Sequence, residues 1–261
     1  MRSGASSAEH VHIPTFQTPL APMRWRGFFD LNGLKAFTYL SVGSILRSFF
    51  HQRFTRCVQM ARSKATQRIV EAAVTHFAAA SYDGASLSAI AEAVGIRKAS
   101  LYAHFASKEA LFMAAFEEAL AKERAFADDC FAGEGSEALP GSHYCQALVR
   151  RFGEVAHLRF FLRTSYISPV TLTEPIDALH EAYLAQLKAH FLDKLSRWEK
   201  ATITPTSTRV SRFGEAYLGI VDSLQVKLIY TTAELGERRL AALLGVFEDS
   251  LTHHLDTGKP S

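Results

Sequence analysis

The sequence predicts an all-α protein, in which a small three-helix domain is followed by a larger helical body. After residue 60, apolar residues recur every three or four positions, and no segment alternates with period two over more than a few residues. Two short helical segments also meet at a tight turn around Gly95. With 261 residues and 48% hydrophobic content, the chain is long enough for the body to bury its own core.

The stretch from 86 to 108 has the pattern of a helix-turn-helix. Ser86 can cap the first helix, and Gly95 supplies the positive φ that a sharp helix exit requires. In the second helix Leu101 and Phe105 lie four residues apart and face inward. The face that remains carries hydrogen-bond donors and no acidic residue, which favours insertion into a DNA groove.

Longer helices are expected on either side of this motif. The first spans 64–80, where apolar residues recur every four positions, and we expect it to pack across the helix-turn-helix. The second begins at Lys108 and runs to about residue 129. Residues 60–107 would then form the small domain, and residues 108–261 the helical body.

One block of the sequence resembles the DNA-binding domain of TetR-type transcriptional regulators. It comprises residues 66–82, then LSAIAEAVGI from Leu87 and ASLYAHFASKEAL from Ala99. The resemblance covers about residues 65–111, and the rest of the chain matches the family only in architecture. The block departs from the family at Ala103, where many relatives carry a second tyrosine or another polar residue, and at Ala99, where glycine is common.

The resemblance implies that the polar face of the second helix binds double-stranded DNA. Arg97 would pair with guanine, whereas Tyr102 and Lys108 would hold the DNA backbone. His104 either donates to a phosphate or supports the fold, and the alternative for the whole set is a solvated charged face. The expected DNA-binding residues are Ser86, Arg97, Lys98, Ser100, Tyr102, His104 and Lys108.

The body is expected to hold a small-molecule effector. Helical patterns cover 143–164 and 174–198, and a break around Pro205 precedes two further helices. The resemblance implies a pocket among the middle helices. Polar residues within apolar stripes are the candidate contacts, although each such residue is more often a satisfied core or surface group than a ligand contact. The effector candidates are Tyr166, Tyr183, Tyr217 and Asp222.

The last two helices carry long apolar seams. Such a helix pair at a chain end often completes its burial against a second copy, which predicts a homodimer. The alternative is an intramolecular pair of core helices. The expected dimer-interface residues are Phe213, Tyr217, Ile220, Leu224, Leu240, Leu244, Phe247 and Leu251.

Residues 1–59 differ from the rest of the chain in composition. They hold seven basic and two acidic residues, whereas the remainder holds 22 and 24, so the net charge of +3 originates in this segment. We expect an over-extended reading frame, with translation beginning at Met60. The alternatives are a disordered basic arm that adds phosphate affinity and a membrane-surface segment around 28–54.

Several other classes are disfavoured. No GxSxG, HExxH, P-loop or helix-opening GxGxxG motif occurs, so we expect neither an enzyme nor a cofactor. Cys57, Cys130 and Cys145 show no metal-binding spacing and fit a reducing cytoplasm, with a redox role for Cys130 or Cys145 as the weaker alternative. No apolar run reaches the ~18 residues of a membrane span.

These observations together predict a cytoplasmic, sequence-specific transcriptional regulator. We expect a ligand-responsive repressor that acts as a homodimer on a palindromic operator. A non-specific nucleoid-type DNA-binding protein and an activator of the same fold are the alternatives.

Overall fold

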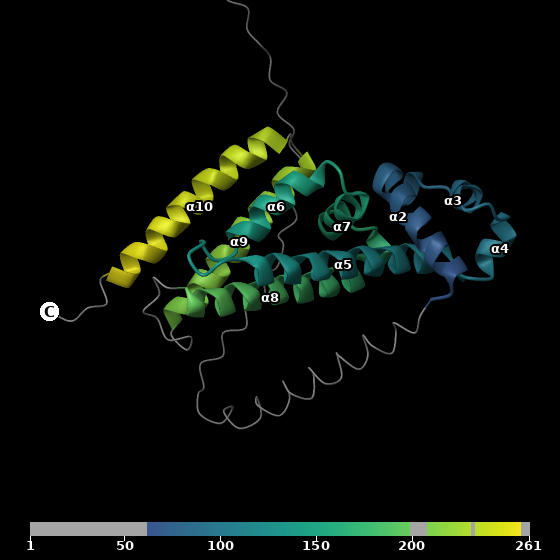
Figure 1. Cartoon of the computed structure of the whole chain (residues 1–261). Helices are drawn as coiled ribbons and strands as arrows, with labels where there is room; N and C mark the ends of the chain where they lie inside the picture. Colours follow the sequence, from purple (N-terminus) through teal and green to yellow (C-terminus); the bar gives the residue numbers. More distant parts are fainter. Residues whose placement is uncertain (1–61, 199–207, 231–232, 257–261) are drawn as a thin grey trace, which may run out of the picture. The chain divides into compact units, whose positions relative to one another are not determined.

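The computed structural model describes residues 62–198, 208–230 and 233–256. Every regular element in these ranges is a helix, which confirms the all-α prediction (Figure 1). The extension over residues 1–59, the proposed start at Met60 and the expected break around Pro205 lie outside the described residues. Among the helices that are described, none is long and apolar enough to cross a membrane.

The reading head consists of α2, α3 and α4. The helices span Lys64–Gly84, Leu87–Ala93 and Lys98–Tyr102. Helix α2 is interrupted at Ser81, where φ is 59°, directly after the predicted end of this helix at residue 80. It packs against α3 and also against two helices of the body, α5 and α7, so α2 is shared by the two parts.

The body comprises the remaining helices in chain order (Figure 1). These are α5 (Lys108–Gly133), α6 (Ser142–Phe152), α7 (Ala156–Tyr166), the short 3₁₀ helix η1 (Val170–Leu172), α8 (Thr173–Arg197), α9 (Thr208–Tyr230) and α10 (Ala233–Asp256). Helix α5 continues from the reading head along α8, and α9 packs against α8 and α10. The predicted long helix after Lys108 is therefore present and ends four residues later than expected.

The helix that the sequence predicts over 143–164 is two helices, α6 and α7, so that prediction is wrong. The chain leaves helical geometry after Gly153, and Val155 caps α7 from an extended conformation. Arg159 donates to the carbonyl oxygens of Phe152 and Gly153 at 3.5 and 2.7 Å, which satisfies the end of α6. The break between α6 and α7 therefore depends on a side chain of α7. Hydrophobic periodicity in the sequence does not reveal such a contact.

A buried carboxylate fixes the start of α6. Glu134 accepts hydrogen bonds from the backbone N–H groups of Gly141 and His143, at 2.8 and 3.0 Å. These groups have no partner within the helix, and a negative charge at a helix N-terminus is favourable. Gly141 has a φ of 77°, and the Tyr217 hydroxyl donates to its carbonyl oxygen at 3.2 Å. The α5–α6 connection is thereby tied to α9.

The core of the body also contains a charged pair. Glu123 on α5 is fully buried, and its two carboxylate oxygens each accept a hydrogen bond of 3.0 Å from Arg151 on α6. The Arg151 guanidinium also lies 3.4 Å from the ring centroid of Phe126. Burial raises the pKa of Glu123, and the hydrogen bonds from Arg151 lower it.

Candidate functional site

The helix-turn-helix forms as its local sequence predicts. The Ser86 hydroxyl accepts the backbone N–H of Ser88 at 3.2 Å, and Gly95 turns the chain with a φ of 74°. Leu101 is fully buried and Phe105 nearly so, which holds α4 in place. The hinge thus fixes the orientation of a helix only five residues long.

The polar face of α4 points to solvent. Arg97, Lys98, Ser100 and His104 are exposed, and Tyr102 has a relative exposure of 49% despite its aromatic ring. Exposure of an aromatic ring to water is unfavourable. Together with two cationic side chains, the ring is better placed to contact a nucleic-acid backbone. Ala103 ends the helix and is exposed as well. Six of the seven expected DNA-binding residues therefore reach solvent, namely Ser86, Arg97, Lys98, Ser100, Tyr102 and His104.

Lys108, the seventh residue of the set, is half-buried at the first position of α5. Its Nζ lies 4.8 Å from the ring centroid of Tyr82, a cation–π contact that restrains the side chain. The Tyr82 hydroxyl in turn donates to Glu109 at 2.6 Å. Lys108 is thus held at a helix N-terminus, where backbone N–H groups favour phosphate.

His104 has a partner inside the protein. Its Nδ1 lies 3.1 Å from the Thr66 hydroxyl, and this contact links the end of α4 to α2. A second such link, between Arg68 and the carbonyl oxygen of Val94 at 3.2 Å, closes the end of α3. Sequence reasoning did not single out Thr66 or Arg68, because neither stands at a periodic position.

Three of the four effector candidates belong to one chain of hydrogen bonds that is buried at Tyr183 and partly buried at Tyr166 and Asp222. The Tyr166 hydroxyl lies 2.9 Å from Asp222 Oδ1 and 3.0 Å from Gln225 Oε1. The Gln225 amide donates to Tyr144 at 3.4 Å, and the hydroxyls of Tyr144 and Tyr183 are 2.7 Å apart. Burial raises the pKa of both Tyr166 and Tyr183, so they are neutral donors at physiological pH. Helices α6, α7, α8 and α9 all contribute to this polar chain.

Tyr217, the fourth effector candidate, lies apart from the polar chain. Its ring stacks on Phe191 with centroids 4.5 Å apart, and its hydroxyl is bonded to Gly141. His180 lies nearer to the polar chain, edge-on to Tyr166, and its buried Nε2 has no hydrogen-bond partner among the described residues. Desolvation lowers the pKa of His180, which keeps its imidazole neutral.

The expected dimer-interface residues are already buried within one chain. Tyr217 and Leu251 have no exposed surface, and the most exposed members of the set, Phe213 and Leu244, reach 8%. The eight side chains, Phe213, Tyr217, Ile220, Leu224, Leu240, Leu244, Phe247 and Leu251, therefore form the intramolecular core that was the alternative. A second copy would have to meet the outer faces of α9 and α10 instead, where Val226, Tyr230 and Val246 are exposed.

An open groove of about 250 Å³ separates α6 from α10. Val149, Leu240, Ala241 and Leu244 form its apolar part, and Gln146, Arg150 and Glu237 its polar part. None of the four effector candidates lines it. Cys130 and Cys145 are buried thiols whose pKa is raised by desolvation, to about 12 for Cys145, so both are poor nucleophiles. Within the described part of the chain, no three ligand-type side chains are grouped to hold a metal.

Residues 69–115 match the family model described as bacterial regulatory proteins, tetR family. The matched segment includes the whole helix-turn-helix and the start of α5. This segment is therefore a TetR-type DNA-binding domain. The reading head built from α2, α3 and α4 carries most of this domain.

A curated relative is similar to this chain over a short segment. The negative transcriptional regulator IcaR of the biofilm operon icaADBC in Staphylococcus aureus is 47% identical over 45 residues, which are 17% of this chain. The match spans about a quarter of the length of that relative (24%). It therefore characterises only a short segment of this chain.

Solved structures share the TetR fold over a greater length. A TetR transcriptional regulator from Chloroflexus aurantiacus has a TM-score of 0.57 at 22% identity and covers 71% of this chain and 94% of its own. A protein described in connection with the control of antibiotic production by bacterial hormones has a TM-score of 0.53 at 19% identity, covering 73% and 98%. At these identities the likeness establishes the fold alone.

Proposed function

We propose that this protein, which carries a TetR-type DNA-binding domain, is a homodimeric, ligand-responsive repressor that binds a palindromic operator. The exposed donor-rich face of α4, set on the buried hinge of Leu101 and Phe105, is the observation that carries the proposal. A helix presented in this way can enter a major groove, while Lys108 and the backbone of α5 hold a phosphate. The short segment of similarity to a negative regulator favours repression.

The homodimer is proposed from exposed apolar surface on the last two helices. Val226 and Tyr230 on α9 and Val246 on α10 have relative exposures of 37%, 66% and 67%. Covering these side chains with a second copy would remove apolar surface from water. A two-fold dimer would place its two α4 helices about 34–36 Å apart, or a multiple of that, to match successive major grooves.

The effector is proposed to act on the polar chain of the body. A small molecule with hydrogen-bonding groups would replace the contact of Tyr166 with Asp222, or of Tyr183 with Tyr144, and so change how α7, α8 and α9 pack. Helix α7 contacts α2, and Arg163 donates to the carbonyl oxygen of Ala78 at 3.2 Å. A shift in the body would thereby reach the reading head as a change in the population of DNA-binding orientations.

The roles within the reading head can be separated by substitution. Arg97→Ala is expected to cost about 1–3 kcal/mol on the preferred site and to relax base choice, because a base-reading contact is lost. Lys108→Ala is expected to weaken binding to all sequences alike and to reduce the salt slope by about one. Fluorescence anisotropy with a panel of single-base variants of the site, at several salt concentrations, measures both effects.

Arg212→Ala serves as the control for charge alone, since this exposed arginine lies on α9, outside the reading head. It is expected to leave both affinity and base preference unchanged. If Arg97→Ala and Lys108→Ala altered base preference equally, the assignment of the two roles would be wrong.

A further inference from the structure

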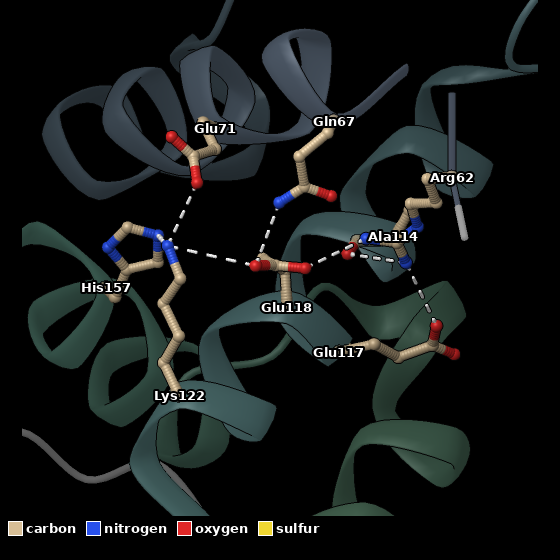
Figure 2. A network of polar contacts seen from close by, with 8 residues as sticks. All are labelled: Arg62, Gln67, Glu71, Ala114, Glu117, Glu118, Lys122 and His157. Atoms are coloured by element: carbon tan, nitrogen blue, oxygen red, sulfur yellow. Dashed lines mark hydrogen bonds and ion pairs between the residues drawn. The ribbon is translucent and has the colours of Figure 1, made fainter. Parts of the chain in front are cut away.

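A cluster of charged and polar side chains joins the reading head to the body (Figure 2). We call it the clasp, and it consists of Arg62, Gln67 and Glu71 in and before α2, Glu117, Glu118 and Lys122 on α5, and His157 on α7. The clasp is the polar part of the contact that α2 makes with α5 and α7. Its geometry therefore bears on the orientation of α2, the first helix of the DNA-binding domain.

Lys122 stands at the centre of the clasp. Figure 2 shows its side chain extending from α5 to a point between Glu71 and His157. The ammonium nitrogen lies 3.1 Å from Glu71 Oε1, 3.8 Å from Glu118 Oε1 and 2.8 Å from His157 Nε2. Glu118 also accepts from Gln67 at 3.0 Å and from Arg62 at 3.2 Å. Lys122 thus connects three helices through one cation.

The contact between Lys122 and His157 requires a neutral imidazole. An ammonium group has three donors and no acceptor, so His157 Nε2 must accept and cannot carry a proton. The charged groups that face His157 are Lys122 and Glu118 from α5 and Glu71 from α2. Desolvation and the nearby Lys122 lower the pKa of His157, against an opposing effect of the two carboxylates.

The phenylalanine contacts of the α2 interface carry no titratable group. Phe77 of α2 meets Phe112 of α5 edge-on at 4.7 Å between centroids, and it stacks with Phe160 of α7 at 5.9 Å. These apolar contacts do not depend on pH, whereas the contact of Lys122 with His157 requires the imidazole to be neutral. Loosening the clasp would therefore let α2 change orientation while the aromatic contacts keep it attached.

We propose that Lys122 and His157 are positioning residues for the reading head, and that protonation of His157 releases the head and weakens DNA binding at acid pH. This inference rests on the proposed DNA-binding function. Because the pKa of His157 is lower when the clasp is formed, the formed clasp binds fewer protons and is favoured at high pH. The clasp is accordingly lost as the pH falls below the ordinary histidine value of about 6.5.

The first test compares DNA affinity at pH 7.5 and pH 5.5 for the full-length wild type and His157→Gln, whose amide oxygen accepts from Lys122 but does not titrate. We expect wild-type affinity to fall about fivefold more than that of His157→Gln, a coupling at the lower end of the usual range. His143→Gln is the control, because this exposed histidine of α6 lies outside the clasp. It is expected to retain the wild-type pH profile.

Lys122 supplies a second comparison at a single pH. At pH 7.5, Lys122→Met is expected to weaken binding to every sequence in the same ratio, and Lys122→Arg to restore most of it. A change in base preference in Lys122→Met would contradict a positioning role, because Lys122 would then act on the bases themselves.

Hydrogen exchange of the same proteins without DNA provides an independent readout. After correction for intrinsic rates, the amides of α2 should lose protection at pH 5.5 in the wild type and not in His157→Gln. Equal pH profiles of DNA binding for the two proteins would overturn the proposal. If the wild type binds no DNA, the proposed function is wrong. In that case the role of the clasp is still tested by hydrogen exchange, and unchanged protection of the α2 amides at pH 5.5 would contradict it.

Discussion

Replacing Arg151 with methionine is expected to lower the free energy of unfolding by about 3–5 kcal/mol, one of the two largest effects that the structure predicts. Glu123 has no exposed surface, and both of its carboxylate oxygens depend on the Arg151 guanidinium. Without Arg151, a buried negative charge loses its partner, and α5 loses its polar link to α6. Urea denaturation followed by circular dichroism measures the change.

The pH dependence of Arg151→Met identifies the cause of the loss. Burial already raises the pKa of Glu123, and removing the guanidinium raises it further. A carboxyl group whose pKa is higher in the folded state than in the unfolded state loses stability as the pH rises through that interval. The defect of Arg151→Met should therefore be smaller at pH 5 than at pH 8.

An exposed ion pair provides the matched control. Arg197 lies 2.6 Å from Asp193 on the surface of α8, with side-chain exposures of 71% and 50%. Arg197→Met is expected to cost less than about 1 kcal/mol, because surface pairs contribute little. The double variant Glu123→Gln, Arg151→Met should recover much of the loss, and a double variant as unstable as Arg151→Met would contradict an unpaired charge as its cause.

Gly141→Ala is the second large destabilisation that we expect, at about 2–5 kcal/mol, from left-handed strain and overpacking together. A Cβ at this position would lie 2.4–2.6 Å from ring and hydroxyl atoms of Tyr217. Tyr217 is fully buried and stacked on Phe191, so it cannot move aside easily. The loss would appear as a lower urea midpoint with an unchanged slope.

Gly95→Ala separates the two contributions. Gly95 has nearly the same φ, 74° against 77°, but nothing lies within 4 Å of its added Cβ. It should show the backbone strain alone, about 1–2 kcal/mol. Equal losses of unfolding free energy in Gly95→Ala and Gly141→Ala would mean that the Tyr217 ring moves aside without destabilising the fold.

The reading head could be predicted from sequence because its determinants are local. The cap at Ser86, the turn at Gly95 and the inward pair of Leu101 and Phe105 lie within twenty residues of one another. Each element of that pattern has one low-energy solution, and the exposed face of α4 follows once the inward residues are known. The roles of the individual DNA-binding residues stay predictions.

The contacts that join the head to the body could not be predicted in this way. Arg163 reaches the carbonyl oxygen of Ala78 across 85 positions, and Lys122 reaches Glu71 across 51. Lys122 also meets His157, 35 positions away. Charge and periodicity assign such residues to solvated faces, and only the packing of α2 against α5 and α7 brings them together.

The terminal helices show how an apolar seam can mislead. Leu224 and Leu251 stand at regular helical spacing, which predicts burial but does not say against what. The structure buries them against the chain's own helices, so the proposed dimer rests on the fewer apolar side chains of the outer faces. Asp222, by contrast, is one of the polar residues that the sequence places within an apolar stripe, and it accepts a hydrogen bond from Tyr166.

The central claim is that a pair of α4 helices reads a specific two-fold symmetric DNA site. Competition binding at moderate salt tests it most directly, with labelled DNA from upstream of the protein's own operon and unlabelled competitors of native or scrambled sequence. The account predicts a preference of about 10³-fold or more for a symmetric native segment. Equal competition by native and scrambled DNA, with a steep salt dependence, would contradict it and indicate a non-specific DNA-binding protein.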